Sequence, residues 1–210
     1  MPDGETTYIK IGGAWFIRPS DSFDGSDGSQ LILNGEGDGT INANGGQDRV
    51  FGGEGDDRLD GGSSADAIYG EEGDDVIDGG YGPDRLFGGE GNDEIRGGAG
   101  GYDDLIVGGQ GNDTLTGGGG ADTFMFAHSH GNDWITDFGD GADVIDLTAF
   151  SAISGVEDLR IWAFGTATVI DLTNNAGGRI WLKDTAVSDL DADDFVFYEP
   201  PADVAAIDGM

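Results

Sequence analysis

The feature that most constrains this chain is a nine-residue pattern that returns along residues 34–125. The stretch GGEGDDRLD at 52–60 has glycine at positions one, two and four, aspartate at position six and leucine at position eight. A fixed short period predicts a repeat architecture in which each unit is one module and neighbouring units share a core. Ten units fit without a gap, all of nine residues except the eighth, which has eleven: 34–42, 43–51, 52–60, 61–69, 70–78, 79–87, 88–96, 97–107, 108–116 and 117–125.

Position eight is apolar in all ten units, and this excludes a disordered acidic linker, which has no reason to keep an apolar period. These residues are Ile41, Val50, Leu59, Ile68, Ile77, Leu86, Ile95, Ile106, Leu115 and Phe124. Each unit divides into a six-residue turn and a three-residue strand with one inward side chain, and two units complete one coil. Stacked coils build two parallel sheets whose position-eight residues face each other. The repeat therefore predicts an all-β fold, a parallel β-roll (β-solenoid) with a thin core.

Position six creates an electrostatic problem for such a stack. It is glycine at Gly39 and aspartate in the other nine units: Asp48, Asp57, Asp66, Asp75, Asp84, Asp93, Asp104, Asp113 and Asp122. Because successive units lie on opposite sides of the roll, the aspartates form two columns, and carboxylates held a few ångströms apart repel strongly. The array has 21 acidic and 4 basic residues, within a chain of net charge −33. Cations must therefore hold the stack together.

Calcium fits these turns better than magnesium does. Calcium takes six to eight oxygens at about 2.3–2.6 Å and accepts carbonyls mixed with carboxylates, whereas magnesium needs a tighter octahedron and releases water reluctantly. A glycine-rich turn with free carbonyls and one aspartate, facing an identical turn, supplies such a cage. We therefore expect several bound calcium ions as the cofactor.

The units at 52–60, 79–87, 88–96, 108–116 and 117–125 match the pattern GGxGxDxUx at every position, where U is a large apolar residue. The chain thus resembles the RTX (repeats-in-toxin) calcium-binding nonapeptide family. The segment that begins GGGGADTFMFAHSHGNDWITDF is similar to the C-terminal flank of serralysin-type secreted proteins, and DADDFVF at 191–197 resembles the end of those domains.

The resemblance implies a β-roll with calcium between stacked turns, which folds outside the cell after type I secretion through an uncleaved C-terminal signal. By position, it implies that the nine aspartates bridge neighbouring ions. It also implies that carbonyls at positions two and four complete the cages, here at Gly53, Gly55, Gly80, Gly82, Gly89, Gly91, Gly109, Gly111, Gly118 and Gly120. Gly39 and Glu71 replace the consensus residues, so the resemblance does not imply a calcium site at these two positions.

Composition divides the chain into four parts. Residues 1–33 hold two alternating segments, Thr6–Ile11 and Ala14–Arg18, around Gly12-Gly13, which predicts an N-terminal β-hairpin or cap. Residues 34–125 are the β-roll. Residues 126–197 contain short apolar and aromatic pieces between Gly, Asn and Asp turns, which predicts a β-rich cap, and residues 198–210 form a tail.

Three sets of residues in the C-terminal flank allow two interpretations each. His128 and His130 lie in a turn-like segment, and we expect an exposed loop rather than a metal-ligand pair or half of a catalytic dyad. Three tryptophans are expected in the core of the flank, with a sugar-stacking platform as the alternative: Trp134, Trp162 and Trp181. Three aspartates indicate either a further calcium site or solvated turns: Asp133, Asp137 and Asp143.

Several classes of function are excluded. The chain has no cysteine, so disulfides and thiolate metal sites are impossible. Its acidity excludes nucleic acid and disfavours an anionic membrane surface, because both need a basic partner. No HExxH, GxSxG or Walker motif is present, and no apolar stretch is long enough to span a membrane.

The sequence therefore favours a secreted, extracellular, non-enzymatic calcium-binding protein that uses type I secretion machinery. An N-terminus without the pattern of a cleavable signal peptide agrees with that route. Two alternatives stay open. One is the C-terminal domain of a larger extracellular protease, lipase or polysaccharide epimerase. The other is an adhesion module that binds extracellular polysaccharide or a cell surface.

Overall fold

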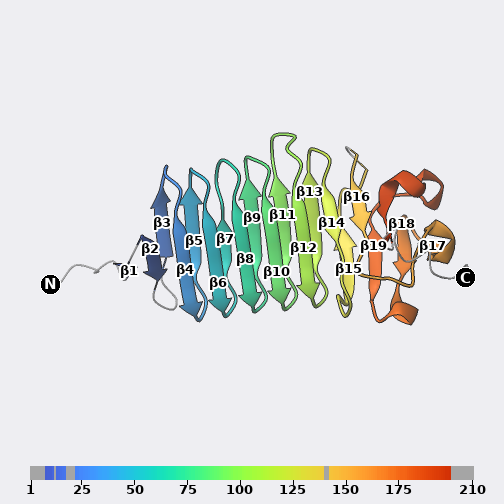
Figure 1. Ribbon diagram of the computed structural model, residues 1–210, viewed down its shortest axis with the longest axis horizontal. Helices are drawn as coiled ribbons and strands as arrows, with labels where there is room; N and C mark the ends of the chain where they lie inside the picture. The colour runs from blue at the N-terminus through green and yellow to red at the C-terminus, as the bar shows by residue number, and fades with distance from the viewer. Residues whose placement is uncertain (1–7, 12, 18–21, 140–141, 200–210) are drawn as a thin grey trace, which may run out of the picture.

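The computed structural model describes residues 8–11, 13–17, 22–139 and 142–199. Two ten-stranded sheets lie face to face along an elongated molecule, with the earliest strands at one end and the latest at the other (Figure 1). From β3 to β16 the chain passes from one sheet to the other at each turn and so winds as a coil. The predicted fold class, an all-β parallel β-roll, is confirmed.

The strands follow one another in a fixed order within each sheet. The first sheet contains, in spatial order, β1 (Tyr8–Ile11), β2 (Ala14–Ile17), β4 (Leu31–Glu36), β6 (Arg49–Glu54), β8 (Ala67–Glu72), β10 (Arg85–Glu90), β12 (Leu105–Gln110), β14 (Thr123–Met125), β16 (Val144–Asp146) and β20 (Phe195–Val196). The second contains β17 (Arg160–Phe164), β18 (Ala167–Asp171), β19 (Arg179–Leu182), β15 (Asn132–Ile135), β13 (Thr114–Gly118), β11 (Glu94–Gly98), β9 (Val76–Gly80), β7 (Arg58–Asp60), β5 (Thr40–Asn44) and β3 (Ser22–Ser26).

The strand register follows the nine-residue period. Val50 lies beside Ile68 and Ile68 beside Leu86 in the first sheet, and all these pairs are parallel. The two extra residues of the unit at 97–107 leave this register intact, because Leu86 still pairs with Ile106. The insertion is taken up in the turn, where Gly101 and Tyr102 are exposed.

The core is a single row of apolar side chains from each sheet. All ten position-eight residues, from Ile41 to Phe124, are at most 1% exposed and belong to one cluster. The same inward positions continue before and after the ten units, with Ile32 in β4, Ile135 in β15 and Ile145 in β16, each 0% exposed. Burying these side chains is the main apolar driving force of the fold.

The two outer faces of the roll differ in character. Side chains alternate across a strand, so position nine points outward when position eight points inward. In the first sheet, Phe51, Tyr69 and Phe87 stack with ring centroids 4.8 Å apart and interplanar angles of 7° and 3°. In the second sheet, the matching residues are polar, and among them Asp60 lies beside Asp78.

Both ends of the roll carry antiparallel strands. β1 and β2 pair around the predicted turn and confirm the N-terminal hairpin, although Thr6, Thr7, Gly12 and Arg18 lie outside the described residues. At the other end, β18 pairs in antiparallel fashion with β17 and β19 and extends the second sheet (Figure 1).

Helical structure is confined to four short 3₁₀ turns among the described residues: η1 (Val156–Asp158), η2 (Thr173–Asn175), η3 (Val187–Asp189) and η4 (Ala192–Asp194). Within the part of the chain that the structure covers, no helix has the length and apolar character needed to cross a membrane.

Candidate metal centre

The turns bring the position-six aspartates into two columns, as the repeat predicts. The first column lies in the turns that lead from the first sheet to the second, and it contains Asp57, Asp75, Asp93, Asp113 and Asp133. The second lies in the return turns, and it contains Asp48, Asp66, Asp84, Asp104, Asp122 and Asp143. All eleven are buried, with exposed fractions of 5% or less.

One oxygen of each carboxylate binds the neighbouring coil. The backbone N–H of Asp57 donates to Asp75 Oδ1 at 2.7 Å, and the N–H of Asp75 donates to Asp93 Oδ1 at 2.9 Å. The second column repeats this contact, with Asp48 N–H on Asp66 Oδ1 at 2.7 Å. These bonds lock successive turns together in register.

The other oxygen has no hydrogen-bond partner in eight of the predicted aspartates. These buried, unpartnered Oδ2 atoms belong to Asp48, Asp57, Asp66, Asp75, Asp84, Asp93, Asp113 and Asp122. A buried acceptor without a partner destabilises the fold by about 1–3 kcal/mol, and more when it is charged. The repetition of this unpartnered oxygen along both columns is the observation against which a cation can be tested.

The raised pKa values of the column aspartates show that their negative charge is poorly balanced within the protein. Burial is the main cause that raises the pKa of Asp75, Asp93 and Asp113 from 3.8 to about 7, and neighbouring carboxylates raise it further. In the second column, burial likewise raises the pKa of Asp84 and Asp122 to about 7. Near neutral pH these columns need either protons or cations.

The position-one glycines shape the space beside Oδ2. A Cβ placed on Gly52 would overlap Asp57 Oδ2 and would lie 2.6 Å from the carbonyl oxygen of Gly70, one coil further along. A Cβ on Gly61 would lie 2.8 Å from Asp66 Oδ2 and 2.7 Å from the Gly79 carbonyl oxygen. Carboxylate and carbonyl oxygens thus line the same confined space, and this mixture of donors suits calcium.

The glycines at positions two and four give the turns their backbone conformation. All ten that the resemblance singles out have positive φ, for example 106° at Gly53 and 109° at Gly55. Glu71 adopts the same left-handed conformation, with φ of 83°, so its turn keeps its shape although the consensus glycine is replaced. These positions also allow close stacking, because a Cβ on Gly82 would overlap Ser64 of the preceding coil.

The donor set fits a cation held largely by backbone oxygens. Among the described residues, no group of three or more His, Asp or Glu side chains is close enough to hold a metal on its own. Each turn contributes one carboxylate, and backbone carbonyls must complete the cage. Buried carboxylate oxygens beside backbone carbonyls are a donor set that fits calcium, and the ligand roles of the position-six aspartates and of the carbonyls at positions two and four stay a prediction of the resemblance.

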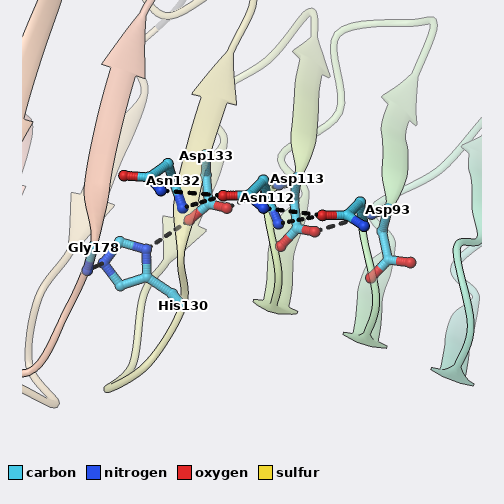
Figure 2. A network of polar contacts seen from close by, with 8 residues as sticks. Asp93, Asn112, Asp113, His130, Asn132, Asp133 and Gly178 are labelled. Atoms are coloured by element: carbon cyan, nitrogen blue, oxygen red, sulfur yellow. Dashed lines mark hydrogen bonds and ion pairs between the residues drawn. The ribbon is translucent and has the colours of Figure 1, made fainter.

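The first column ends at a histidine (Figure 2). His130 Nδ1 lies 2.6 Å from Asp133 Oδ2, and the backbone N–H of Gly178 donates to His130 Nε2 at 3.0 Å. Because Nε2 accepts, Nδ1 carries the proton and donates it to the carboxylate. Asp133 therefore has a protein partner for the oxygen that is unpartnered in Asp57, Asp75, Asp93 and Asp113.

The second column ends in a similar way. Asp143 Oδ1 accepts the backbone N–H of Asp122 at 3.0 Å, and Asp143 Oδ2 accepts that of Gly139 at 2.8 Å. The nearby Asp137 accepts the N–H groups of Gly117 and Gly118. All the carboxylate oxygens of Asp133, Asp137 and Asp143 thus accept hydrogen bonds within the protein, which differs from solvated turns, and a further calcium site at these residues stays a prediction.

The expectation of exposed histidines was wrong for His130. Its ring is 2% exposed, because it lies at position three of a further coil and packs against Phe126 and Phe150, with centroids 5.0 and 6.2 Å away. His128 is exposed, as predicted.

The expectation of core tryptophans was wrong as well. Trp134 is 40% exposed, because Ile135 takes the inward position of β15 and Trp134 faces outward. Trp181 stacks on it with centroids 5.1 Å apart and an interplanar angle of 19°, and Trp162 is half-buried on β17.

Position five of the repeat points to solvent. Asp38 is exposed, and its Oδ1 accepts the N–H of Asp56 at 3.1 Å. The amides of Asn112 and Asn132 continue this exposed row beside the aspartate column (Figure 2). The register predicted from the sequence thus separates a buried carboxylate at position six from an exposed one at position five.

The fold and its turns define a parallel β-roll built from glycine–aspartate nonapeptides. The model of the family described as the RTX calcium-binding nonapeptide repeat (4 copies) matches residues 33–68, 69–101 and 99–126 of this chain. No curated protein matches the chain.

Three solved structures are similar to parts of this chain. The AlgE6R2 subunit of the Azotobacter vinelandii mannuronan C5-epimerase is 30% identical, with a TM-score of 0.44, over 61% of this chain and 90% of that one. The AlgE6R3 subunit of the same enzyme is 24% identical, with a TM-score of 0.35, over 96% and 88%. The extracellular lipase LipA of Serratia marcescens is 18% identical, with a TM-score of 0.45, over 82% of this chain and 39% of the lipase.

Proposed function

We propose that this protein is a calcium-binding module whose β-roll folds when calcium fills the turns. The observation that carries the proposal is the row of buried Oδ2 atoms without partners in both columns. With carbonyl oxygens beside them, these atoms form repeated oxygen cages, and the bound ions offset the repulsion between carboxylates. Because the unfolded chain offers no preformed cage, the free energy of binding becomes free energy of folding.

A calcium titration tests this function. Far-ultraviolet circular dichroism should show little strand signal in excess chelator and a cooperative gain at millimolar calcium, while native mass spectrometry counts several bound ions. Magnesium at equal concentration serves as the control and should give a smaller gain. A strand signal that is unchanged in excess chelator would contradict the proposal.

The same linkage supports a secreted, extracellular protein. Cytosolic calcium is far below the affinity expected for millimolar sites, so the chain stays unfolded inside the cell and can pass through a type I secretion channel. Folding on calcium outside then opposes return. Efficient export of a variant without residues 150–210 would argue against a C-terminal signal.

A second candidate function concerns a patch on the C-terminal cap, formed by Trp134, Phe164 and Trp181 with Arg160 and Arg179. Phe164 is 64% exposed and lies edge-on to Trp181, with centroids 5.5 Å apart. Both arginines lie near Asp171, at 3.7 and 3.8 Å. An aromatic surface with local positive charge, on a chain of net charge −33, suits an anionic polysaccharide, whose sugar rings stack on indole faces.

Binding to an oligouronate, measured by calorimetry in calcium, tests this second candidate. Trp134→Ala and Phe164→Ala should each weaken binding about tenfold, and Tyr102→Ala, which removes an exposed aromatic ring from the distant turn of the roll, should leave it unchanged. Equal binding by all three variants would rule out the patch.

The chain can also act as one module of a larger extracellular enzyme, since the similar structures come from an epimerase and a lipase. An antibody against the β-roll decides this point, because it detects the mature protein at its full size. A mature form near the 21.7 kDa of this chain would contradict the larger enzyme.

A further inference from the structure

The first unit of the array, at 34–42, contains an exchange of two residues within one turn. Position one is Asn34, where the matching units have glycine, and position six is Gly39, where they have aspartate. Taken one at a time, these residues are two departures from the repeat, and the loss of the carboxylate interrupts the first column at its beginning.

The structure shows that the two departures compensate each other in space. A Cβ on Gly39 would lie 2.6 Å from Asn34 Nδ2 and 2.7 Å from its Oδ1, so the asparagine side chain fills the space that an aspartate at position six would need. In the unit at 52–60 the relation is reversed, since Asp57 Oδ2 lies over Gly52. The same small volume is filled from opposite ends of the turn.

The hydrogen bonds of Asn34 fix the orientation of its amide. Nδ2 donates to Asp57 Oδ1 at 2.9 Å and to the Gly37 carbonyl oxygen at 2.9 Å. Both partners are acceptors, so the nitrogen must face them, and the oxygen must point elsewhere. Asn34 is 4% exposed, and its Oδ1 is buried without a hydrogen-bond partner.

The stacking of this coil on the next one is intact despite the exchange. The backbone N–H of Gly39 donates to Asp57 Oδ1 at 2.6 Å, the same contact that the aspartates make along the rest of the column. The unpartnered oxygens of Asn34 and Asp57 thus belong to side chains that touch each other, in a turn whose backbone follows the repeat.

We propose that Asn34 Oδ1 takes the place of the position-six carboxylate and completes a further calcium site at the N-terminal end of the first column. The inference rests on the proposed calcium-binding function. A neutral amide oxygen is an acceptable ligand for calcium, but it contributes less charge than aspartate, and affinity depends on the number of charged ligands. This site therefore fills last in a titration.

The exchange can be tested with three variants of the full chain, because each residue can be returned to the consensus alone or together with the other. Asn34→Gly removes the amide oxygen and should lower the count of bound ions by one in native mass spectrometry at saturating calcium. Gly39→Asp alone places two side chains in one space and should raise the calcium midpoint for folding at least threefold. Asn34→Gly combined with Gly39→Asp should restore the ion count and tighten the weakest site about tenfold.

A matched control is Asn92→Gly, which removes an exposed amide at position five, in the row beside the first column. It should keep the ion count of the unchanged chain. An unchanged count in Asn34→Gly would overturn the inference, and so would a double variant that binds no more ions than Asn34→Gly. If the unchanged chain bound no calcium, the proposed function itself would fail, and this result is distinct from the loss of one ion among several.

Discussion

Each position-six aspartate uses its two oxygens for two different contacts. Oδ1 accepts a backbone N–H from the coil before it, while Oδ2 is buried among carbonyl oxygens without a partner. Asparagine offers only one oxygen for these two contacts, and the absence of a Cβ at Gly52 leaves the space that Asp57 Oδ2 occupies. Aspartate therefore suits a turn in which one oxygen binds the neighbouring coil and the other is left for the cation that we propose.

This division of contacts predicts a contrast between two aspartates. Asp93→Ala removes a buried carboxylate from the middle of the first column and should weaken calcium binding more than tenfold. Asp38→Ala removes an exposed position-five carboxylate and should change affinity less than threefold. Calorimetric calcium titration of both variants measures the difference. Equal losses in the two variants would show that the register is wrong.

His130 carries a second prediction at this scale. His130→Ala leaves Asp133 Oδ2 and the Gly178 N–H without their partners, and both groups are buried at the junction of β15 and β19. We expect a loss of about 2–4 kcal/mol in the free energy of unfolding at saturating calcium. Chemical denaturation measures it, and His128→Ala, which alters an exposed ring, should lose less than about 1 kcal/mol. A similar loss in both variants would contradict the role of the His130 contacts.

At the scale of the element, the nine-residue period predicts the strands of the array and their inward residues. It fails where the glycines of the pattern disappear. The coil at 128–136 has Gly131, Asp133 and Ile135 at positions four, six and eight, but histidine and serine stand at positions one and two. Ser129 supplies the positive φ that glycine supplies elsewhere, at 66°, and this substitution hides the coil from a pattern based on glycine.

The ends of the columns were harder to predict for the same reason. Nothing in the pattern shows that His130 reaches Asp133, or that Asn34 fills the space beside Gly39, because both contacts depend on how one coil stacks on another. The outward tryptophans were missed because their pairing with β18 and β19 joins strands far apart in sequence. Local periodicity predicts what each unit does alone, and it gives little information about contacts between unlike units.

The aromatic ladder of the first sheet carries a prediction of its own. Tyr69 stacks between Phe51 and Phe87, so Tyr69→Ala breaks two ring contacts on three neighbouring strands. We expect a loss of about 2–4 kcal/mol in the free energy of unfolding in calcium, from ring stacking and lost apolar burial together. Tyr81→Ala, at a ring that is 60% exposed, is the matched control and should lose less than about 1 kcal/mol. Equal stability of the two variants would contradict a structural role for the ladder.

The C-terminal strands cover one end of the roll, and we expect the roll to need them in order to fold. A solenoid end exposes apolar edges and unpaired backbone groups, and here β15, β16 and β19 cover that end with Ile135, Ile145 and Ile180. A chain that ends at Met125 should therefore remain disordered at calcium concentrations that fold the full chain. A chain without residues 1–33 should still fold, with weaker affinity. Circular dichroism of both fragments tests this, and cooperative folding of residues 34–125 alone at the same calcium midpoint would contradict the capping role.

At the scale of the whole molecule, the roll is held together against its own charge. The chain has 42 acidic and 9 basic residues, and the two columns concentrate carboxylates in its interior. In the part of the chain that the structure describes, the ion pairs formed by arginines, such as those of Arg96 with Glu94 and of Arg160 with Asp171, do not involve the column aspartates. If cations fill the turns as we propose, they act on the molecule as a whole, because each cage would take its oxygens from two neighbouring coils.

This dependence gives a pH prediction with a definite sign. Burial raises the pKa of Asp66, Asp84 and Asp93 from 3.8 to about 7. A raised pKa means that the folded state binds protons more tightly than the unfolded state. Protonation therefore stabilises the calcium-free roll, fully below about pH 3.8, and this stabilisation is lost as the pH rises through about 7. Calcium must displace these protons, so its affinity falls as the pH is lowered.

We therefore expect two opposite trends between pH 8 and pH 5.5. In chelator, the strand signal should rise as the pH falls, because protons take over part of the role of calcium and the net charge becomes less negative. In calcium titrations, the midpoint should move to higher concentration over the same range, with protons released on binding near pH 7. Circular dichroism follows the first trend, and calorimetry in buffers of different ionisation enthalpy measures the protons. A calcium midpoint that stays constant from pH 8 to pH 5.5 would show that the buried aspartates do not titrate in this range, and that another group neutralises the columns.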